Sequence, residues 1–397
     1  MDYENITTDD QLCDYCRELA AADSIAFDTE FVSEHTYRPV LCLVQVAAAG
    51  RLAVIDALAV NDMRPFWDAI LAAGHETVVH AGRGEMEFCL HATGQIPARL
   101  FDVQIAAGLA GYEYPAGFGT LVSRILNQTS QKHETRTDWQ RRPLSKRQIE
   151  YALEDALYLH PLCDSLRARL REQGRLSWLE AEMADWREDL QRSVLQEHWR
   201  RVSGNAGLSA RSLAIVRELW KWRDAEAQRR DQPARRVLRD DLIIELARRQ
   251  TADVKRIRAV RGMERGDLLR RVGDMAAAIQ RALTLAEEQC PTRSPREPSL
   301  QLSVLGQFLF AALGSICRQA QLAPNLVGSP NDIRELINYR ANHSPEGRRP
   351  PRLAHGWREQ FVGHLFEDLL AGKVAIRIRD PEADYPLVFE RAEQSGE

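Results

Sequence analysis

The sequence predicts a multidomain protein in which an α/β domain with a mixed sheet is followed by all-α helical domains. At 397 residues the chain is too long for one ordinary hydrophobic core, and two or three domains are expected. Strand-like apolar runs alternate with helical patterns up to residue 175, whereas only helical patterns recur after residue 208. Segments rich in glycine or proline separate the parts. The expected parts are 1–175 (α/β), 176–207 (helical linker), 208–290 and 299–382 (helical) and 383–397 (flexible tail).

The α/β part begins with a helix, which is followed by five strand-like runs. Four polar residues at positions 7–10 can cap that first helix, in which apolar residues recur at helical spacing. Gly50 marks the turn between the second and third strands, and the later strands alternate with helices, which indicates a mixed sheet. The expected strands are 25–31, 41–47, 52–56, 77–81 and 100–103, and the expected helices are 62–73, 83–93, 104–110, 118–126 and 145–173.

Two acids are set into the first of these strands. Residues i and i+2 of a strand point to the same face, so Asp28 and Glu30 project side by side while Thr29 faces away. Two adjacent carboxylates raise each other's pKa unless a cation neutralises them. Two hard oxygen ligands suit Mg²⁺ or Mn²⁺. The alternative interpretation is a strand end whose acids reach solvent, because Asp-x-Glu is a short and common pattern.

Another acid lies on the helix that closes the α/β part. Tyr151 and Asp155 are four residues apart and meet on one helical face, whereas Glu154 is turned away. Apolar residues surround them, and a carboxylate in such a setting is costly unless it is paired or binds a metal. The alternative is a Tyr–Asp hydrogen bond at a helix edge.

Glu85 and Glu87 begin the helix that follows the strand at 77–81. Acids in a first turn also complement the helix dipole. Because the two are only two residues apart, they cannot both face one centre.

Charge changes sign along the chain. Residues 1–160 carry 13 Lys and Arg against 23 Asp and Glu, whereas residues 210–290 carry 19 against 13. An acidic part that needs metals, joined to a basic part that holds phosphates, fits a nuclease. The alternative is that each part has only a solvated charged surface.

Composition argues against a membrane or secreted protein. No apolar run reaches the roughly 18 residues that a membrane span needs, and the acidic N-terminus lacks the pattern of a secretory signal. Seven scattered cysteines favour reduced thiols in the cytoplasm over a disulfide framework. Cys13 and Cys16 have no second pair at zinc spacing. Without a heptad run or a large apolar stripe, a monomer is expected.

The motifs, in this order, resemble the ribonuclease D family of DEDD exonucleases, in its tyrosine-containing branch. The resemblance rests on 27–31, on His80-Ala81-Gly82 with an acid at 85, on 136–139 with 142–144, and on Tyr151 and Asp155. It covers nearly the whole chain, because residues 208–288 resemble an HRDC domain and residues 299–382 resemble the family's second, more divergent helical domain. The implied fold is a ribonuclease-H-like mixed-sheet exonuclease domain followed by two helical HRDC-type domains.

The resemblance implies a 3′→5′ exoribonuclease that releases nucleoside 5′-monophosphates with two divalent metal ions, Mg²⁺ or Mn²⁺. Position by position, Asp28, Glu30, Glu85 and Asp155 would bind metal, and Tyr151 would orient or help to deprotonate the attacking water. One metal would activate that water and the other would stabilise the leaving 3′ oxygen. The implied substrates are structured RNAs, chiefly tRNA precursors with 3′ extensions, recognised by shape and backbone.

One position departs from the family pattern, because Glu85 stands where the family has aspartate. The added methylene moves the carboxylate by over about 1 Å, and mispositioning of that size can cost roughly a hundredfold in rate. Glu87 or a small helix shift would compensate. Two alternatives therefore stand beside the active exoribonuclease. One is a catalytically impaired RNA-binding protein, and the other is a DNA 3′→5′ exonuclease, since HRDC-like domains also occur in DNA helicases.

Further residues are predicted to contact nucleic acid on weaker grounds. Arg136, Asp138 and Trp139 either line the substrate channel or pin their loop. His80 either is a buried structural histidine, the preferred interpretation, or contacts the substrate; Gln45 either reaches the terminal nucleotide or lies on the outer face of the sheet. Basic side chains of the HRDC-like part either contact phosphates or form a solvated helix face: Lys221, Arg223, Arg229, Arg230, Arg235 and Arg236.

Overall fold

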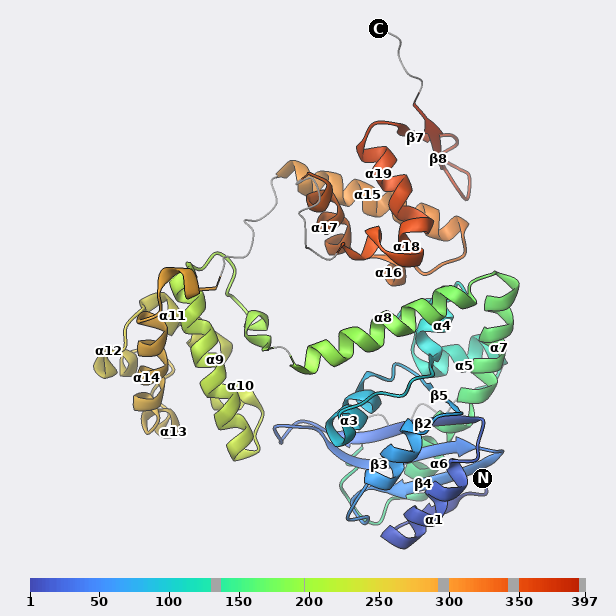
Figure 1. Ribbon diagram of the computed structural model, residues 1–397, viewed down its shortest axis with the longest axis horizontal. Helices are drawn as coiled ribbons and strands as arrows, with labels where there is room; N and C mark the ends of the chain where they lie inside the picture. The colour runs from blue at the N-terminus through green and yellow to red at the C-terminus, as the bar shows by residue number, and fades with distance from the viewer. Residues whose placement is uncertain (130–136, 196, 292–299, 342–349, 393–397) are drawn as a thin grey trace. The chain divides into compact units, whose positions relative to one another are not determined.

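The computed structural model describes residues 1–129, 137–195, 197–291, 300–341 and 350–392 (Figure 1). The chain divides into two compact units. The first comprises residues 1–30, 42–192 and 298–397, and the second comprises residues 31–41 and 193–297. In the described part of the chain, no helix combines the length and the apolar character that crossing a membrane requires.

A six-stranded mixed sheet forms the centre of the first unit, in the order β1-β4-β3-β2-β5-β6. β2, β5 and β6 run parallel, β3 and β4 pair antiparallel, and β1 is parallel to β4. The predicted mixed sheet is confirmed, and the short edge strand β1 adds to it. The strands are β1 Glu4–Ile6, β2 Ser24–Val32, β3 Val40–Ala48, β4 Arg51–Asp56, β5 Glu76–Val79 and β6 Leu100–Asp102.

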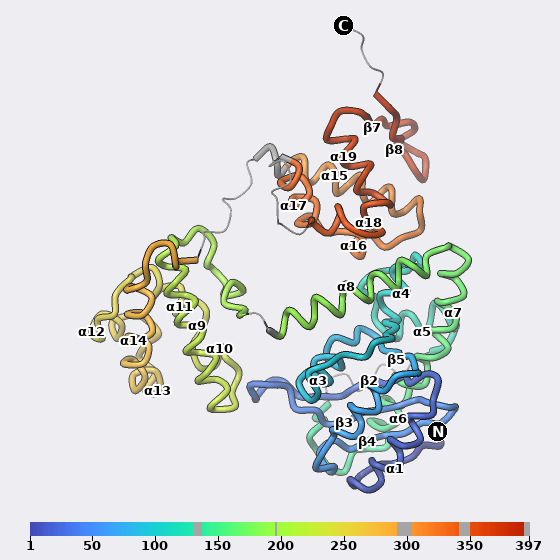
Figure 2. The backbone as a smooth tube through the Cα atoms, viewed as in Figure 1, coloured from blue at the N-terminus to red at the C-terminus, as the bar shows by residue number. Residues whose placement is uncertain are grey.

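Helices pack against this sheet (Figure 2). Polar caps set where several of them begin. Thr8 accepts a hydrogen bond from the backbone N–H of Gln11 at the start of α1, and Ser145 and Gln148 form a reciprocal capping box at the start of α6. The helix predicted over 145–173 is divided near Tyr158. The helices are α1 Asp9–Leu19, α2 Arg64–Leu71, α3 Arg83–Thr93, α4 Val103–Leu109, α5 Phe118–Leu126, α6 Lys146–Leu157 and α7 Leu159–Glu172.

Alternate residues of β2 face opposite sides of the sheet. The fully buried Phe27 packs edge-on against Phe66 and Trp67 of α2, with ring centroids 5.5 and 6.2 Å away. Burying a ring of this size stabilises the fold by about 1.5–3 kcal/mol. Because Phe27 faces α2, Asp28 projects from the opposite face of the strand.

The helix after α7 belongs to the first unit, which differs from the predicted linker over 176–207. α8 (Leu176–Leu195) contributes Leu179 and Met183 to the core. Its buried Glu182 accepts hydrogen bonds from Arg358 at 2.5 and 2.9 Å and from Trp357 at 3.1 Å. Removing one partner of such a buried ion pair costs about 3–5 kcal/mol, so the pair fastens the C-terminal helices to α8.

The C-terminal part combines helices with a hairpin that the sequence interpretation placed partly in a flexible tail from residue 383. Val374, Ile376 and Ile378 alternate with Ala375 and Arg377, which is the period of a strand, and Arg377 pairs with Glu390 across the hairpin. The elements are α15 Leu300–Gln319, α16 Pro324–Val327, α17 Pro330–Ala341, η3 Arg352–Ala354, α18 Gly356–Arg358, η4 Glu359–Gly363, α19 His364–Leu370, β7 Val374–Ile378 and β8 Leu387–Arg391.

The second unit has its own helical core, built by leucine, isoleucine and valine side chains of α9, α11 and α14. The breaks predicted near 231–233 and 262 are confirmed, because Asp231 caps the end of α9 with a positive φ of 46° and Gly262, with a φ of 97°, lies in the turn between α12 and α13. The elements are η1 His198–Arg201, α9 Ala210–Arg230, α10 Ala234–Val237, α11 Asp240–Arg249, α12 Val254–Arg258, α13 Gly266–Leu269, α14 Val272–Leu283 and η2 Glu287–Gln289.

Candidate active site

Asp28 and Glu30 lie on β2, in the middle of the sheet, and both are partly exposed. The adjacent strand β3 carries Gln45, which is fully buried and whose Nε2 donates to Oδ2 of Asp28 at 3.3 Å. Gln45 therefore orients an acid of the site and does not lie on an exposed outer face of the sheet.

α6 brings Tyr151 and Asp155 to the same side of β2 as Asp28 and Glu30. The Tyr151 hydroxyl donates to the carboxylate of Asp155, as neighbours four residues apart on a helix can. The negative charge of Asp155 acts on both acids of β2. Residues from two distant segments thus surround one centre.

The loop before α6 supports Tyr151. The buried Trp139 ring lies 6.3 Å from the Tyr151 ring, tilted by 34°. Arg142 fastens this loop to the sheet, since its guanidinium donates to both carboxylate oxygens of Asp56 at 2.6 and 2.7 Å and to the carbonyl of Cys42 at 2.9 Å. These contacts support the interpretation in which this loop is held in place against the sheet.

α3 brings Glu85 to the site from the side of β2 that carries Thr29. Glu85 is only 5 % exposed, and its Oε1 accepts a hydrogen bond of 2.6 Å from the Thr29 hydroxyl. Glu87 instead pairs with Arg83 at 2.9 Å. Of the two acids that begin α3, it is therefore Glu85 whose charge acts on Glu30.

Burial raises the pKa of all four carboxylates, and neighbouring negative charges add to the rise. Burial is the larger cause for Asp28, Glu30, Glu85 and Asp155 alike. The pKa of Glu30 rises to about 9 because its carboxyl is desolvated and faces the charges of the other three acids. No lysine or arginine of the described residues is among the groups that shift these four pKa values. Burial and the charge of Asp155 also raise the pKa of Tyr151.

This arrangement fits divalent cations. Acids that repel one another favour a bound cation, which removes the repulsion. Among the described residues, no three His, Cys, Asp or Glu side chains are arranged to hold a metal ion by themselves. Mg²⁺ usually takes one or two carboxylates and completes its shell with water and phosphate oxygens. The buried Oε1 of Gln45 has no hydrogen-bond partner in the described part of the chain, so an acceptor for such a water is present.

The other residues predicted near this site have local roles. His80 is half-buried, its Nε2 donates to the carbonyl of Ala116 at 3.0 Å, and its ring lies edge-on to Phe118 at 5.3 Å, as expected of a structural histidine. Asp138 is exposed and accepts a hydrogen bond from the backbone N–H of Gln140 at 3.0 Å, which caps a turn. Arg136 lies outside the described residues.

Arg223 and Lys221 of the second unit, both predicted to contact phosphates, differ in their exposure. Arg223 is only 5 % exposed and donates to Asp240 at 2.6 Å and to the carbonyl of Leu238 at 3.0 Å. Its guanidinium joins α9 to α11 and presents no surface to a phosphate, which corrects the prediction for this residue. Lys221 is exposed and pairs with Glu197 at 2.9 Å.

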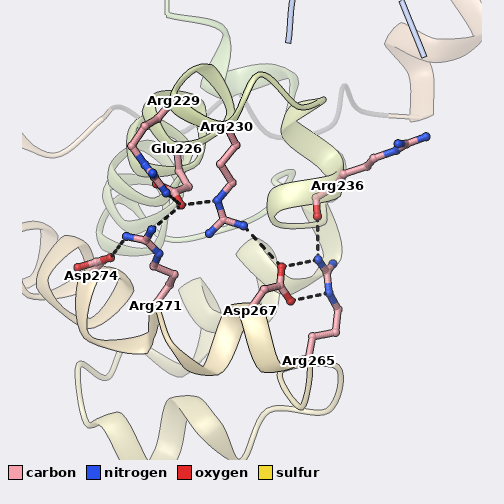
Figure 3. Close-up of polar contacts among 8 residues, drawn as sticks. All are labelled: Glu226, Arg229, Arg230, Arg236, Arg265, Asp267, Arg271 and Asp274. Atoms are coloured by element: carbon pink, nitrogen blue, oxygen red, sulfur yellow. Dashed lines mark hydrogen bonds and ion pairs between the residues drawn. The ribbon is translucent and has the colours of Figure 1, made fainter. Parts of the chain in front are cut away.

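Arg229 and Arg230 belong to a network of ion pairs around Glu226 (Figure 3), and the guanidinium groups of Arg235 and Arg236 lie outside it. Arg229 and Arg230 both bind the buried carboxylate of Glu226. The guanidinium of Arg236 points away from that network, and its Nη2 lies 3.2 Å from Nδ1 of His35, within the same unit. Arg235 is 74 % exposed and lies 3.3 Å from Asp240. Arg235 and Arg236 are therefore exposed cations of the predicted set that lie outside this network, as Lys221 does, whereas Arg229 is exposed but bound to Glu226.

Asp102 and Thr29 support the site but were not predicted to do so. Asp102 is buried at the end of β6, and its carboxylate accepts hydrogen bonds from the backbone N–H groups of Ala81 and Gly82 at 3.2 and 2.9 Å. It also caps α4, and an aspartate between a strand and a helix is a recognisable cap in a sequence. The hydrogen bonds from Ala81 and Gly82 form only in the folded chain, so no local sequence pattern reveals them.

Comparison with known proteins agrees with this geometry. Residues 3–171 match the family model of 3′–5′ exonucleases, and residues 212–279 match that of HRDC domains. The chain is 34 % identical to ribonuclease D of Acidiphilium cryptum over 94 % of either chain. It is 30 % identical to ribonuclease D of Escherichia coli, covering 93 % of this chain and 99 % of that one.

A solved structure shows a similar fold over most of the chain. The crystal structure of Escherichia coli RNase D, described as an exoribonuclease involved in structured RNA processing, is similar with a TM-score of 0.81 and 28 % identity. The similarity covers 94 % of this chain and 99 % of that one. The predicted exonuclease domain and the first of the two predicted HRDC-type domains are confirmed. This chain therefore belongs to the ribonuclease D family, and it is a 3′→5′ exoribonuclease.

Proposed function

We propose that the protein trims the 3′ ends of structured RNA, chiefly tRNA precursors with 3′ extensions, at the acids of β2, α3 and α6. The observation that carries the proposal is the convergence of four carboxylates that the described residues leave without a cation. A buried acid cluster of this kind is costly to stability and is therefore expected to serve binding or catalysis.

Asp28, Glu30, Glu85 and Asp155 would hold two divalent cations, Mg²⁺ or Mn²⁺. When bound, such ions supply a nucleophilic water at neutral pH and stabilise charge on the leaving 3′ oxygen. Gln45 keeps Asp28 oriented through its 3.3 Å hydrogen bond. Rigid placement of these groups matters because displacements near 1 Å can cost roughly a hundredfold in rate.

Tyr151 would place the attacking water. Its hydroxyl is held by Asp155 and its ring is supported by Trp139, so the side chain is fixed in position. Its raised pKa keeps the phenol protonated at neutral pH, and because its one O–H is donated to Asp155, its oxygen would accept a hydrogen bond from that water.

The HRDC domain would hold the body of the RNA by its phosphates. Arg235 and Arg236 on α10 are exposed and consecutive, and phosphate contacts of this kind position a nucleic acid without reading its sequence. We place the activity in the reducing cytoplasm, because all seven cysteines are free thiols, and in a monomer.

The tethering role can be tested with two substrates that share one 3′ end: a 3′-extended tRNA precursor and a short single-stranded RNA. Arg235→Glu combined with Arg236→Glu should raise KM for the precursor about tenfold and leave kcat and KM for the short RNA unchanged. Arg256→Glu combined with Arg258→Glu makes the same charge change on exposed positions of α12 and should leave both substrates unaffected. An equal effect of the two pairs, or none on the precursor, would contradict the proposed tether.

A further inference from the structure

Thr29 stands between Asp28 and Glu30 in sequence but points to the opposite face of β2. It is 6 % exposed, and its Oγ1 donates to Oε1 of Glu85 at 2.6 Å. A hydrogen bond from a hydroxyl to a carboxylate is shorter and stronger than one between neutral groups. β2 thus carries two acids on one face and, between them, the hydroxyl that holds a third acid.

The start of α3 has little freedom to move Glu85. Ala81 adopts a left-handed φ of 52°, and the N–H groups of Ala81 and Gly82 donate to the buried carboxylate of Asp102. A Cβ atom on Gly82 would lie 2.3 Å from a methyl carbon of Val79, so the turn also packs closely on β5. Because the helix start is held in this way, the reach of residue 85 depends on the length of its side chain.

An aspartate at position 85 would not make the same contact. It would draw the carboxylate back by about one carbon–carbon bond, about 1.5 Å. That displacement takes a contact of 2.6 Å beyond hydrogen-bonding distance. The contact with Thr29 is therefore specific to the glutamate that distinguishes this chain from the family pattern.

We propose that Thr29 is a positioning residue whose hydroxyl fixes the carboxylate of Glu85 beside Asp28 and Glu30, so that a glutamate serves at this position. The inference rests on the proposed role of Glu85 in the site. It names a specific partner that accommodates the longer side chain, where the sequence offered only Glu87 or a shift of the helix.

The test is a double-mutant cycle in the full chain, with Thr29→Val, Glu85→Asp and the combination. With glutamate at position 85, Thr29→Val should lower kcat on a short RNA about tenfold with KM unchanged, the size expected for one charge-assisted hydrogen bond. With aspartate at position 85, the same substitution should leave kcat unchanged. Thr29→Ser, which keeps the hydroxyl, should restore most of kcat.

Thr77→Val is the matched control, because Thr77 is fully buried on β5 and its hydroxyl lies 3.4 Å from His75. It should leave kcat unchanged with either residue at position 85. Melting temperatures of the metal-free proteins give a second cycle that does not depend on activity. There, Thr29→Val should lower the melting temperature more when residue 85 is glutamate than when it is aspartate.

An equal loss of kcat in the two backgrounds, or no loss in either, would overturn the inference. Glu85→Ala separates this failure from that of the proposed function. Full kcat in Glu85→Ala would remove Glu85 from the site, and both would fail. A large loss in Glu85→Ala beside an unaffected Thr29→Val would leave the site in place and overturn only the role of Thr29.

Discussion

Arginines surround Glu226 in the second unit, whereas no lysine or arginine of the described residues is among the groups that shift the pKa of the four acids at the site in the first unit. In the second unit Glu226 accepts hydrogen bonds from Arg229 at 2.7 and 2.8 Å, with Arg230 and Arg271 also against it (Figure 3). The hydrogen bond from Arg229 is the main reason that the pKa of Glu226 falls to about 2. In the first unit, burial and neighbouring acids raise the pKa of Glu30 to about 9.

The difference separates a structural from a functional use of acids. A buried carboxylate with an arginine partner can hold helices together, and Glu226 does so between α9 and the segment around Arg271. A buried carboxylate beside other carboxylates weakens the fold until a cation arrives. The acids of β2, α3 and α6 are therefore expected to gain their partners from outside the chain, which is what a metal-dependent nuclease requires.

Removing one acid of the site should have the largest effect. Asp28→Asn keeps the shape of the side chain but removes its charge, and kcat on a short RNA should fall at least about 1,000-fold, roughly 4 kcal/mol of transition-state stabilisation. In chelator, the same variant should melt at a higher temperature than the unsubstituted protein, because repulsion within the site is relieved. Steady-state kinetics and calorimetry measure the two effects, and a lower melting temperature would show that Asp28 is structural.

Removing the phenol should have the next largest effect. Tyr151→Phe keeps the contact with Trp139 but loses the hydroxyl that Asp155 holds, so kcat should fall about 100-fold with KM little changed. Trp139→Phe is the companion variant, because it alters only the support of the ring, and its loss should be smaller. Equal losses in the two variants would mean that Tyr151 acts by packing alone.

Divalent cations should stabilise one unit and not the other. Mn²⁺ at 100 times its dissociation constant adds about 2.7 kcal/mol to whatever folded part binds it. The melting transition of the first unit should shift upward in Mn²⁺, while that of the second unit should stay in place. Asp28→Asn should abolish most of the shift, and an equal shift of both transitions would contradict the contrast between the units.

Removing the charge of Glu226 should have the opposite effects from removing that of Asp28: lower stability and unchanged catalysis. Glu226→Gln should destabilise the second unit by about 1–2 kcal/mol and leave kcat on a short RNA unchanged. Because the folded pKa lies below the ordinary value near 4.5, this stabilisation is present above pH 4.5 and is lost as pH falls toward about 2. Urea unfolding across that range should therefore show the two proteins converging in acid.

The acids of the first unit should show the reverse pH dependence. Glu30 has a folded pKa of about 9, above its ordinary value near 4.5, so the metal-free first unit should lose stability as pH rises through that window. Glu30→Gln should flatten this slope in urea unfolding with chelator present. A slope that is unchanged by Glu30→Gln would mean that its charge is already compensated.

Periodic patterns account for most of the fold prediction. β2 to β5, the helices between them and the division of the second unit at Asp231 all follow from apolar spacing and turn residues. β1 is only three residues long and depends on pairing with β4, so no local pattern defines it. α8 was assigned to a linker because its charged surface hides the buried Glu182–Arg358 pair, which joins residues far apart in the sequence.

The site was predictable where spacing alone brings groups together. Asp28 with Glu30 and Tyr151 with Asp155 each obey a strand or helix period, and the family resemblance added Glu85. Gln45 and Thr29 act through contacts between strands or between a strand and a helix, so only the folded chain relates them to the acids. The prediction for Arg223 was wrong for the same reason, since its partner Asp240 becomes its neighbour only on folding.

The most direct test of the cleavage site follows a 5′-labelled, 3′-extended tRNA precursor over time with Mg²⁺, with Mn²⁺ and with chelator, beside Asp28→Asn. The acids of β2, α3 and α6 should produce a ladder that shortens one nucleotide at a time from the 3′ end and releases 5′-monophosphates. The ladder should vanish in chelator and in Asp28→Asn. Shortening that persists in either, or binding without shortening in both metals, would contradict the assignment of these acids as the cleavage centre.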